Sequence, residues 1–144
     1  MSRNGRDSTS EHADHAARTF AEDLLPLPGA ARHARDLVTE ACVRWEVEDL
    51  TAPAVLIISE LVSNVLDHAH TIMTLHLALR PEGLYLGVRD GNASPPVAAP
   101  VPVTSMTGRG LRLVEAVSTT WGYSTAAGGK TVWATLALPR RPVP

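Results

Sequence analysis

The wide apolar face of residues 51–69 constrains the fold more than any other feature of the sequence. Its apolar side chains recur at three- and four-residue steps: Leu50, Ala54, Ile57, Ile58, Leu61, Val62 and Val65. Such spacing is typical of an α-helix, and the width of the face indicates burial on most sides. Thr51 fits an N-cap, and Pro53 would lie in the first turn, where its missing N–H costs nothing. A chain with this helix needs other elements to cover it.

Those elements follow from the apolar periods of the flanking segments. Helical spacing also occurs before residue 45 and again after residue 107, whereas the remaining segments alternate apolar and polar residues, as strands do. The expected helices are 29–45, 51–69 and 108–119, and the expected strands are 17–25, 71–80, 84–89, 121–125 and 131–138. Turn residues join neighbouring strands into hairpins. The order predicts an α+β fold, a two-layer α/β sandwich whose mostly antiparallel mixed sheet is covered by helices on one face.

Length and composition set further bounds. The 144 residues fit one domain, which we expect at 17–139 after a polar, disordered tail at 1–16. The formal net charge of −2 argues against a dedicated nucleic-acid binder. The single cysteine, Cys42, falls on an apolar helix face and is expected to be buried. Neither a secretion signal nor a stretch of the ~18 apolar residues that a membrane span needs is expected, so we expect a cytoplasmic protein.

Polar residues interrupt the long apolar helix at four-residue spacing, at Glu60, Asn64 and His68. This spacing stacks the three side chains along one face, among apolar neighbours, where a carboxylate, a carboxamide and an imidazole need partners. The spacing alone fits two interpretations: a structural or solvent-facing row, and a binding site. His68 lies near the helix end and is interpreted as a structural residue.

Two further segments carry glycines at points where a ligand could approach. Asp90-Gly91 ends a predicted strand, where a carboxylate can accept a hydrogen bond from an amino group and glycine admits a flat ligand, although Asp-Gly is also a common turn. Residues 108–111 (Gly108, Arg109, Gly110, Leu111) come just before a predicted helix, whose N-terminus favours an anion such as phosphate. Arg109 could add a charged contact to that phosphate.

Residues 129–131, Gly-Lys-Thr, invite comparison with the phosphate loop of nucleotide-binding proteins. That motif needs a glycine at position 124, which is Ser124, and a helix afterwards. Residues 132–138 alternate as a strand instead, so the phosphate-loop interpretation is rejected. A glycine-led turn into a strand that forms one wall of the site fits better.

These segments, in this order, resemble the ATP-binding motifs of the GHKL ATPases, the superfamily of gyrase, histidine kinases and MutL. Residues 60–68 resemble the N-box, 90–92 the adenine-reading box, 108–111 the glycine box at the end of the ATP lid, and 129–133 the final box. The resemblance covers about residues 20–138. It is closest to the stand-alone anti-sigma-factor-type serine kinases and the small actinobacterial regulatory ATP-binding proteins. It implies the histidine-kinase-like ATPase fold, also called the Bergerat fold.

The resemblance implies ATP and Mg²⁺ as cofactors and a role for each matching residue. Glu60 would be the general base, and Asn64 would coordinate Mg²⁺. Asp90 would accept a hydrogen bond from the adenine amino group, with Gly91 beside it and support from Thr131. The glycine box, made of Gly108, Arg109, Gly110 and Leu111, would hold the phosphates and hinge the lid.

The implied function is that of an ATP-binding regulator similar to anti-sigma factor serine/threonine kinases, which transfer the γ-phosphate to a serine of an antagonist protein. The implied partners are a sigma factor and/or an anti-sigma antagonist, with a homodimer as the expected assembly and no direct contact with nucleic acid or membrane. The alternative is a non-catalytic, nucleotide-dependent protein-binding module. Residues 91–107 favour it, because this proline-rich segment has no lysine and leaves Arg109 and Lys130 as the nearby cations.

Overall fold

The computed structural model describes residues 18–92 and 106–139. The elements, in chain order, are β1 (Thr19–Leu24), α2 (Ala30–Arg44), a short 3-10 turn (Glu48–Leu50), α3 (Thr51–His68), β2 (Met73–Arg80), β3 (Gly83–Asp90), α4 (Met106–Val117), β4 (Thr120–Ala126) and β5 (Gly129–Ala137). Every helix and strand expected from the sequence is present within a few residues of its expected bounds. The expected N-terminal tail and most of the expected proline-rich segment lie outside the described residues.

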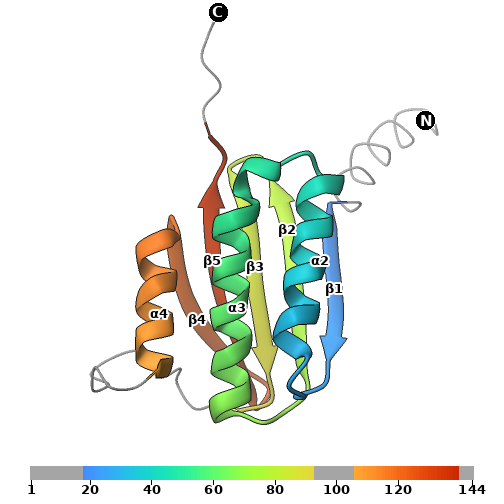
Figure 1. The fold of residues 1–144 in the computed structure, drawn as a ribbon. Coiled ribbons are helices and arrows are strands. Elements are labelled where there is room, and N and C mark those ends of the chain that lie inside the picture. Colours follow the sequence, from blue (N-terminus) through green and yellow to red (C-terminus); the bar gives the residue numbers. More distant parts are fainter. Residues whose placement is uncertain (1–17, 93–105, 140–144) are drawn as a thin grey trace, which may run out of the picture.

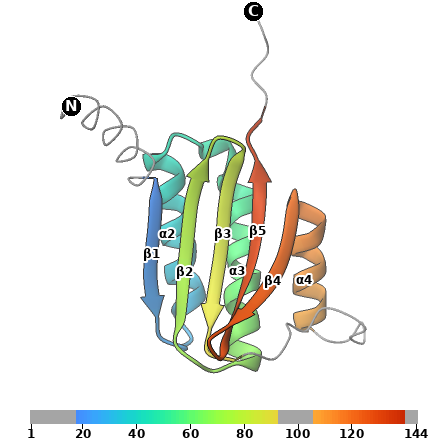
Figure 2. The same cartoon turned by 180° about the vertical axis from the view of Figure 1, so that it is seen from behind.

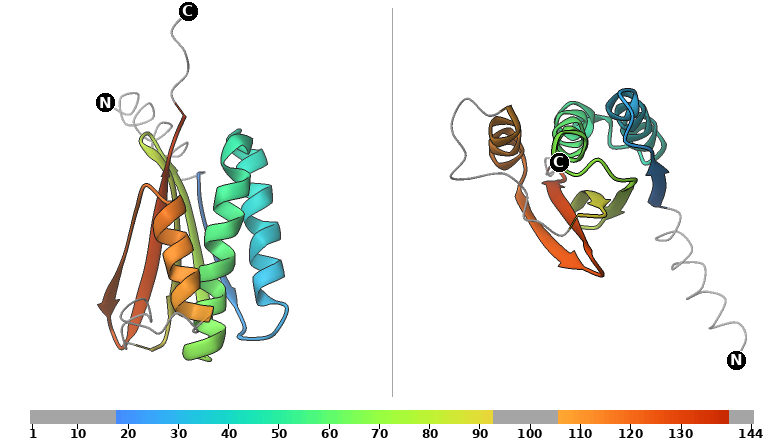
Figure 3. Two further views of the ribbon diagram at one scale, coloured as in Figure 1. Left: turned by 60° about the vertical axis from the view of Figure 1, so that its left-hand side comes forward. Right: turned by 90° about the horizontal axis from the view of Figure 1, so that it is seen from below.

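The strands form one five-stranded sheet in the order β1-β2-β3-β5-β4. All four pairings are antiparallel, so the described part of the sheet contains no parallel pair and is not mixed. Helices α2, α3 and α4 lie side by side on one face, while none of the described helices covers the other face (Figures 1 and 2). The end-on view shows the two layers directly (Figure 3). This confirms the predicted α+β, two-layer architecture.

Helix α3 lies at the centre of the helical layer, between α2 and α4, and packs on β3 and β5. Its fully buried side chains include Ile57, Ile58 and Leu61, which explains the wide apolar face. Thr51 is the first helical residue rather than the N-cap; the cap is Leu50 and makes no side-chain bond. The prediction of a Thr51 cap was wrong because the preceding 3-10 turn leads directly into the helix.

The core also bears on two expectations from the sequence, the burial of Cys42 and the absence of a segment apolar enough to span a membrane. Cys42 is buried on α2, as predicted, and this burial raises the pKa of its thiol. The segment Glu48–His68 is 21 residues long with a hydropathy of 1.4, so it is long and apolar enough to span a membrane, contrary to the expectation that no segment is. Its place in the core of the sandwich is the ordinary reason for such an apolar helix.

The side chains along each strand alternate between the two faces of the sheet, as the sequence predicts, and the apolar ones face the helices. Leu75, Leu77, Leu84 and Leu86 are buried against the helical layer, while their strand neighbours face the open side. Helix α3 and strand β3 both end at the same edge of the sandwich, where α4 and β5 begin (Figure 1). The topology therefore gathers four chain segments that are far apart in sequence at one edge.

Candidate functional site

Asn64 lies one turn before the end of α3, close to the edge where the four segments meet. Its side chain is 3% exposed, and its Oδ1 has no hydrogen-bond partner among the described residues. Buried polar atoms in folded proteins are almost always paired, so an unpaired carbonyl oxygen here indicates a position for a ligand. An amide oxygen is a ligand of the kind that Mg²⁺ prefers, usually together with substrate phosphates.

Glu60 lies one helical turn before Asn64 on the same face of α3, about 6 Å back along the axis. The side chain is half-buried. Burial raises the pKa of its carboxyl, and the nearby charge of Asp67 raises it further. A carboxylate of raised pKa is a better proton acceptor, which suits a general base. His68, one more turn along, is exposed and engaged in a contact at the helix end.

Asp90 is the last residue of β3, and its side chain is buried on the helix-covered face. The Asn92 N–H donates to its Oδ1 over 2.7 Å, which closes a tight turn. The Lys130 Nζ lies 2.9 Å from its Oδ2, in an ion pair with side-chain exposures of 3% and 0%. The same Nζ donates to the Asn92 carbonyl at 3.2 Å. Oδ2 has no further partner of good hydrogen-bond geometry among the described residues.

A close backbone approach and a hydrogen bond fix the turn after β3. A Cβ on Gly129 would overlap the carbonyl oxygen of Asp90, so only glycine lets the start of β5 lie against the end of β3. The Gly91 N–H donates to the Thr71 Oγ1 over 2.9 Å, which ties the turn to the segment after α3. A Cβ on Gly91 would make only ordinary contacts. Glycine is therefore required by packing at 129 but not at 91.

The predicted glycine box lies within α4 rather than before it. The helix begins at Met106, so Gly108 falls in its first turn and Arg109 and Gly110 follow in helical backbone. N–H groups of a first turn lack partners within the helix and can bind an anion. Leu111 is 1% exposed and packs in the core, which anchors the helix beside α3.

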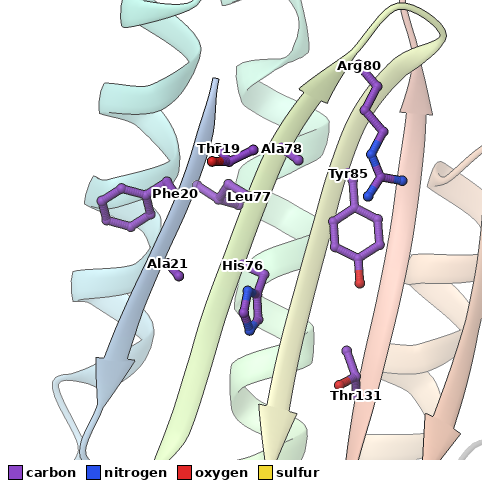
Figure 4. A pocket seen from close by; sticks show the side chains of 9 residues that line it. All are labelled: Thr19, Phe20, Ala21, His76, Leu77, Ala78, Arg80, Tyr85 and Thr131. Atoms are coloured by element: carbon purple, nitrogen blue, oxygen red, sulfur yellow. The ribbon is translucent and has the colours of Figure 1, made fainter. Parts of the chain in front are cut away.

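Thr131 does not lie with Asp90. It is paired across the sheet with Arg89, whereas Asp90 is paired with Lys130. Thr131 therefore faces the helix-free side, as Figure 4 shows. The sequence contained the signal for this: Val132, Ala134 and Leu136 are the apolar, helix-facing residues of β5, so residue 130 shares their face and residue 131 does not. The residue missed at the site is Lys130.

A shallow concavity on the helix-free face is separate from this site. Figure 4 shows Thr131, Tyr85, Arg80 and His76 among its lining residues. The Arg80 guanidinium lies 4.8 Å from the centre of the Tyr85 ring, and Tyr85 stacks with Trp133 at 6.4 Å. Tyr85 thus contacts both Arg80 and Trp133 on the surface of the sheet. No group of three or more metal-ligating side chains occurs in the described ranges, so a cation at Asn64 would need ligand oxygens from phosphates.

Comparison with known proteins adds to this geometry. The sequence profile of the family described as histidine kinase-like ATPase domain matches residues 24–136. Thirteen chains in solved structures match. One is the crystal structure of the RsbU and RsbW domains of Rv1364c from Mycobacterium tuberculosis, with a TM-score of 0.64 and 22% identity over 85% of this chain. The chain spans only 33% of that protein's length, and at this identity the likeness shows the fold. Among curated proteins, none matches.

Proposed function

The chain belongs to the histidine kinase-like ATPase domain family, and from that premise we propose that it binds ATP with Mg²⁺ and transfers the γ-phosphate to a serine of a partner protein. The observation that carries the proposal is the unpaired, buried Oδ1 of Asn64 one turn from Glu60, whose pKa is raised. The confirmed GHKL family gives the general ATP-binding assignment. The finer assignment to a serine kinase rests on these two side chains.

The residues at this edge have two kinds of proposed role, nucleotide binding and catalysis. Asn64 supplies an amide oxygen for Mg²⁺, which neutralises phosphate charge when bound. Asp90 offers a buried acceptor for the adenine amino group, and the first turn of α4 offers backbone N–H groups to the phosphates. Gly91 lies beside Asp90 in the turn, and Arg109 follows the first turn of α4. Thr131 has no part in this site because it faces the other side of the sheet.

In the proposed phosphoryl transfer, one bond to the γ-phosphorus forms and one breaks. The serine hydroxyl oxygen of the partner forms a bond to the γ-phosphorus, and the bond from that phosphorus to the bridging oxygen of ADP breaks. The hydroxyl proton passes to Glu60, and ADP leaves with the bonding electron pair. Phosphoryl transfer of this kind depends mainly on positioning and charge neutralisation.

The partner follows from the resemblance of the motifs and from the fold shared with the RsbW domain. We propose a cytoplasmic regulator that binds a sigma factor and/or an anti-sigma antagonist and phosphorylates the antagonist on serine. A homodimer is the proposed assembly.

Phosphotransfer from labelled ATP tests the catalytic role. With Mg²⁺ and candidate antagonist proteins, the wild type should produce phosphoserine, and Glu60→Gln should reduce the rate at least about a hundredfold, the usual contribution of a general base. Glu40→Gln is the matched control, because it makes the same chemical change at an exposed position of α2. Equal rates for Glu60→Gln and the wild type would remove Glu60 from the chemistry.

The alternative is a non-catalytic module whose ATP-bound form is recognised by a partner. Two observations favour it: residues 91–107 contain no charged side chain, and the Lys130 ammonium is already engaged by Asp90 and Asn92. This alternative predicts ATP-dependent partner binding without phosphoserine, and hydrolysis that Glu60→Gln leaves unchanged. The phosphotransfer assay therefore separates the two functions.

A further inference from the structure

Lys130 is the only lysine in the sequence, whose other basic side chains are arginine or histidine. It is also the most buried cation that the structure describes, at 3% exposure. An ammonium group so removed from water is tolerated only when it is paired and hydrogen-bonded. Its two contacts are with Asp90 and with the Asn92 carbonyl, the first and last residues of one turn.

These contacts fix the Asp90 carboxylate on two sides. Oδ1 accepts from the Asn92 N–H at 2.7 Å, and the ammonium lies 2.9 Å from Oδ2. The Lys130 Nζ also holds the Asn92 carbonyl, so both ends of the turn are tied to β5. The backbone of Gly129 packs on the Asp90 carbonyl and supports the same arrangement. The carboxylate therefore has little freedom to rotate.

The charge of Asp90 explains why a cation is needed at this place. A buried carboxylate without a counter-charge is strongly unfavourable. An adenine base is neutral. Its amino group could donate a hydrogen bond to the Asp90 carboxylate, but it could not balance the negative charge of that carboxylate. Lys130 is the counter-charge that lies against the carboxylate, and Oδ2 still lacks a hydrogen-bond partner of good geometry among the described residues.

We propose that Lys130 is a positioning residue for nucleobase recognition, which holds the Asp90 carboxylate so that Oδ2 can accept the exocyclic amino group of adenine. This inference rests on the proposed ATP site. It assigns the recognition of the amino group to an Asp–Lys pair rather than to the aspartate alone. Lys130 acts through Asp90, so its loss should affect the amino contact and spare the rest of the nucleotide.

Comparison of ATP with purine riboside triphosphate, which lacks only the amino group, tests the inference. The wild type should bind ATP about tenfold or more tightly than the analogue, the usual size of a hydrogen bond to a charged group. In Lys130→Met that ratio should fall close to one while the affinity for the analogue stays unchanged. Arg44→Met is the control for charge, because it removes an exposed cation of α2, and it should keep the wild-type ratio.

If the role of Lys130 were purely structural, Lys130→Met would bind both nucleotides more weakly by the same factor. The ratio of the two affinities would then stay at its wild-type value, and that result would overturn the inference. If the wild type binds neither nucleotide, the proposed function itself fails. If the wild type discriminates and Lys130→Met discriminates equally, only the role of Lys130 fails. The two failures are therefore distinguishable.

Two further measurements guard against a variant that does not fold. Asp90→Asn combined with Lys130→Met removes both charges, so it should melt at a higher temperature than either single variant. In the wild type, isotopically labelled lysine gives one side-chain signal, because the chain has one lysine. Saturating ATP should shift that signal more than the analogue does; equal shifts with the two nucleotides would contradict the inference.

Discussion

Glu60 and Asn64 lie on successive turns of one helix but in different surroundings. Asn64 is buried with an unpaired oxygen, whereas Glu60 is half-buried beside the exposed Asp67. In the proposed site the first arrangement would stabilise a bound cation, whereas the second stabilises the protonated form of a carboxyl. Both arrangements cost the free protein stability, which is common at functional sites.

The raised pKa of Glu60 predicts a dependence of stability on pH. Because burial and then Asp67 raise this pKa above its ordinary value of 4.5, the folded state favours the protonated carboxyl. The stability that Glu60 contributes is thus fully present below pH 4.5 and is lost as pH rises through the pKa of the folded state. Glu60→Gln should therefore melt at a higher temperature than the wild type at neutral pH, and this advantage should shrink as the pH falls.

The control for that comparison is again Glu40→Gln, whose carboxyl is exposed. Thermal melts of the three proteins across a series of buffers are sufficient. A Glu60→Gln protein that is less stable than the wild type at neutral pH, or an advantage that does not change with pH, would contradict the assigned environment of Glu60.

At the scale of elements, the site depends on how the start of β5 meets the end of β3. Antiparallel pairing places Lys130 directly opposite Asp90, and the absence of a side chain at Gly129 allows the close approach. The Thr71–Gly91 bond adds the segment after α3 to the same junction. The geometry of the proposed nucleotide site thus depends on three chain segments that are held together by packing.

Gly129→Ala tests this junction. Its new Cβ would meet the backbone oxygen of Asp90, which cannot move without separating the strands, so we expect a loss of about 1–3 kcal/mol in the free energy of unfolding. Denaturant unfolding measures that loss. Gly29→Ala is the matched control, because no atom lies within 4 Å of its added Cβ and its φ is an ordinary −81°, and it should leave stability nearly unchanged. Equal stability of the two variants would show that the close approach is not required.

The sequence predicted the helices and strands well because the apolar residues in each of them recur at regular spacing. The apolar stripe of α3 and the alternation of β2 and β3 depend on local spacing, which a single sequence displays. The strand order was not predictable in the same way, because the placement of β5 between β3 and β4 is decided by long-range packing. The boundary at Thr51 was wrong for a local reason, the 3-10 turn before it.

Part of the site was also within reach of the sequence. The i, i+4 spacing placed Glu60 and Asn64 on one face, and the strand end placed Asp90. The motif resemblance suggested Thr131, but the alternation of β5 assigns it to the other face and Lys130 to the site. The ion pair itself could not be predicted, since it depends on the register between two strands that are far apart in sequence.

For the molecule as a whole, we propose that Mg²⁺ and ATP bind at the edge where α3, β3, β5 and α4 meet. Calorimetric titration of ATP with and without Mg²⁺ is the most direct measurement. Wild-type affinity should increase with Mg²⁺, Asn64→Ala should lose at least about tenfold of the affinity measured with Mg²⁺, and Asp90→Asn should bind more weakly in both conditions.

Ser59→Ala serves as the control for this titration, because the Ser59 hydroxyl bonds only to the Val55 carbonyl of its own helix. It should bind ATP as the wild type does, with the same dependence on Mg²⁺. A site at this edge predicts that Asn64→Ala and Asp90→Asn bind ATP more weakly than Ser59→Ala does. If folded Asn64→Ala and Asp90→Asn bind ATP as tightly as the wild type in both conditions, the proposed site at this edge of the sandwich is wrong.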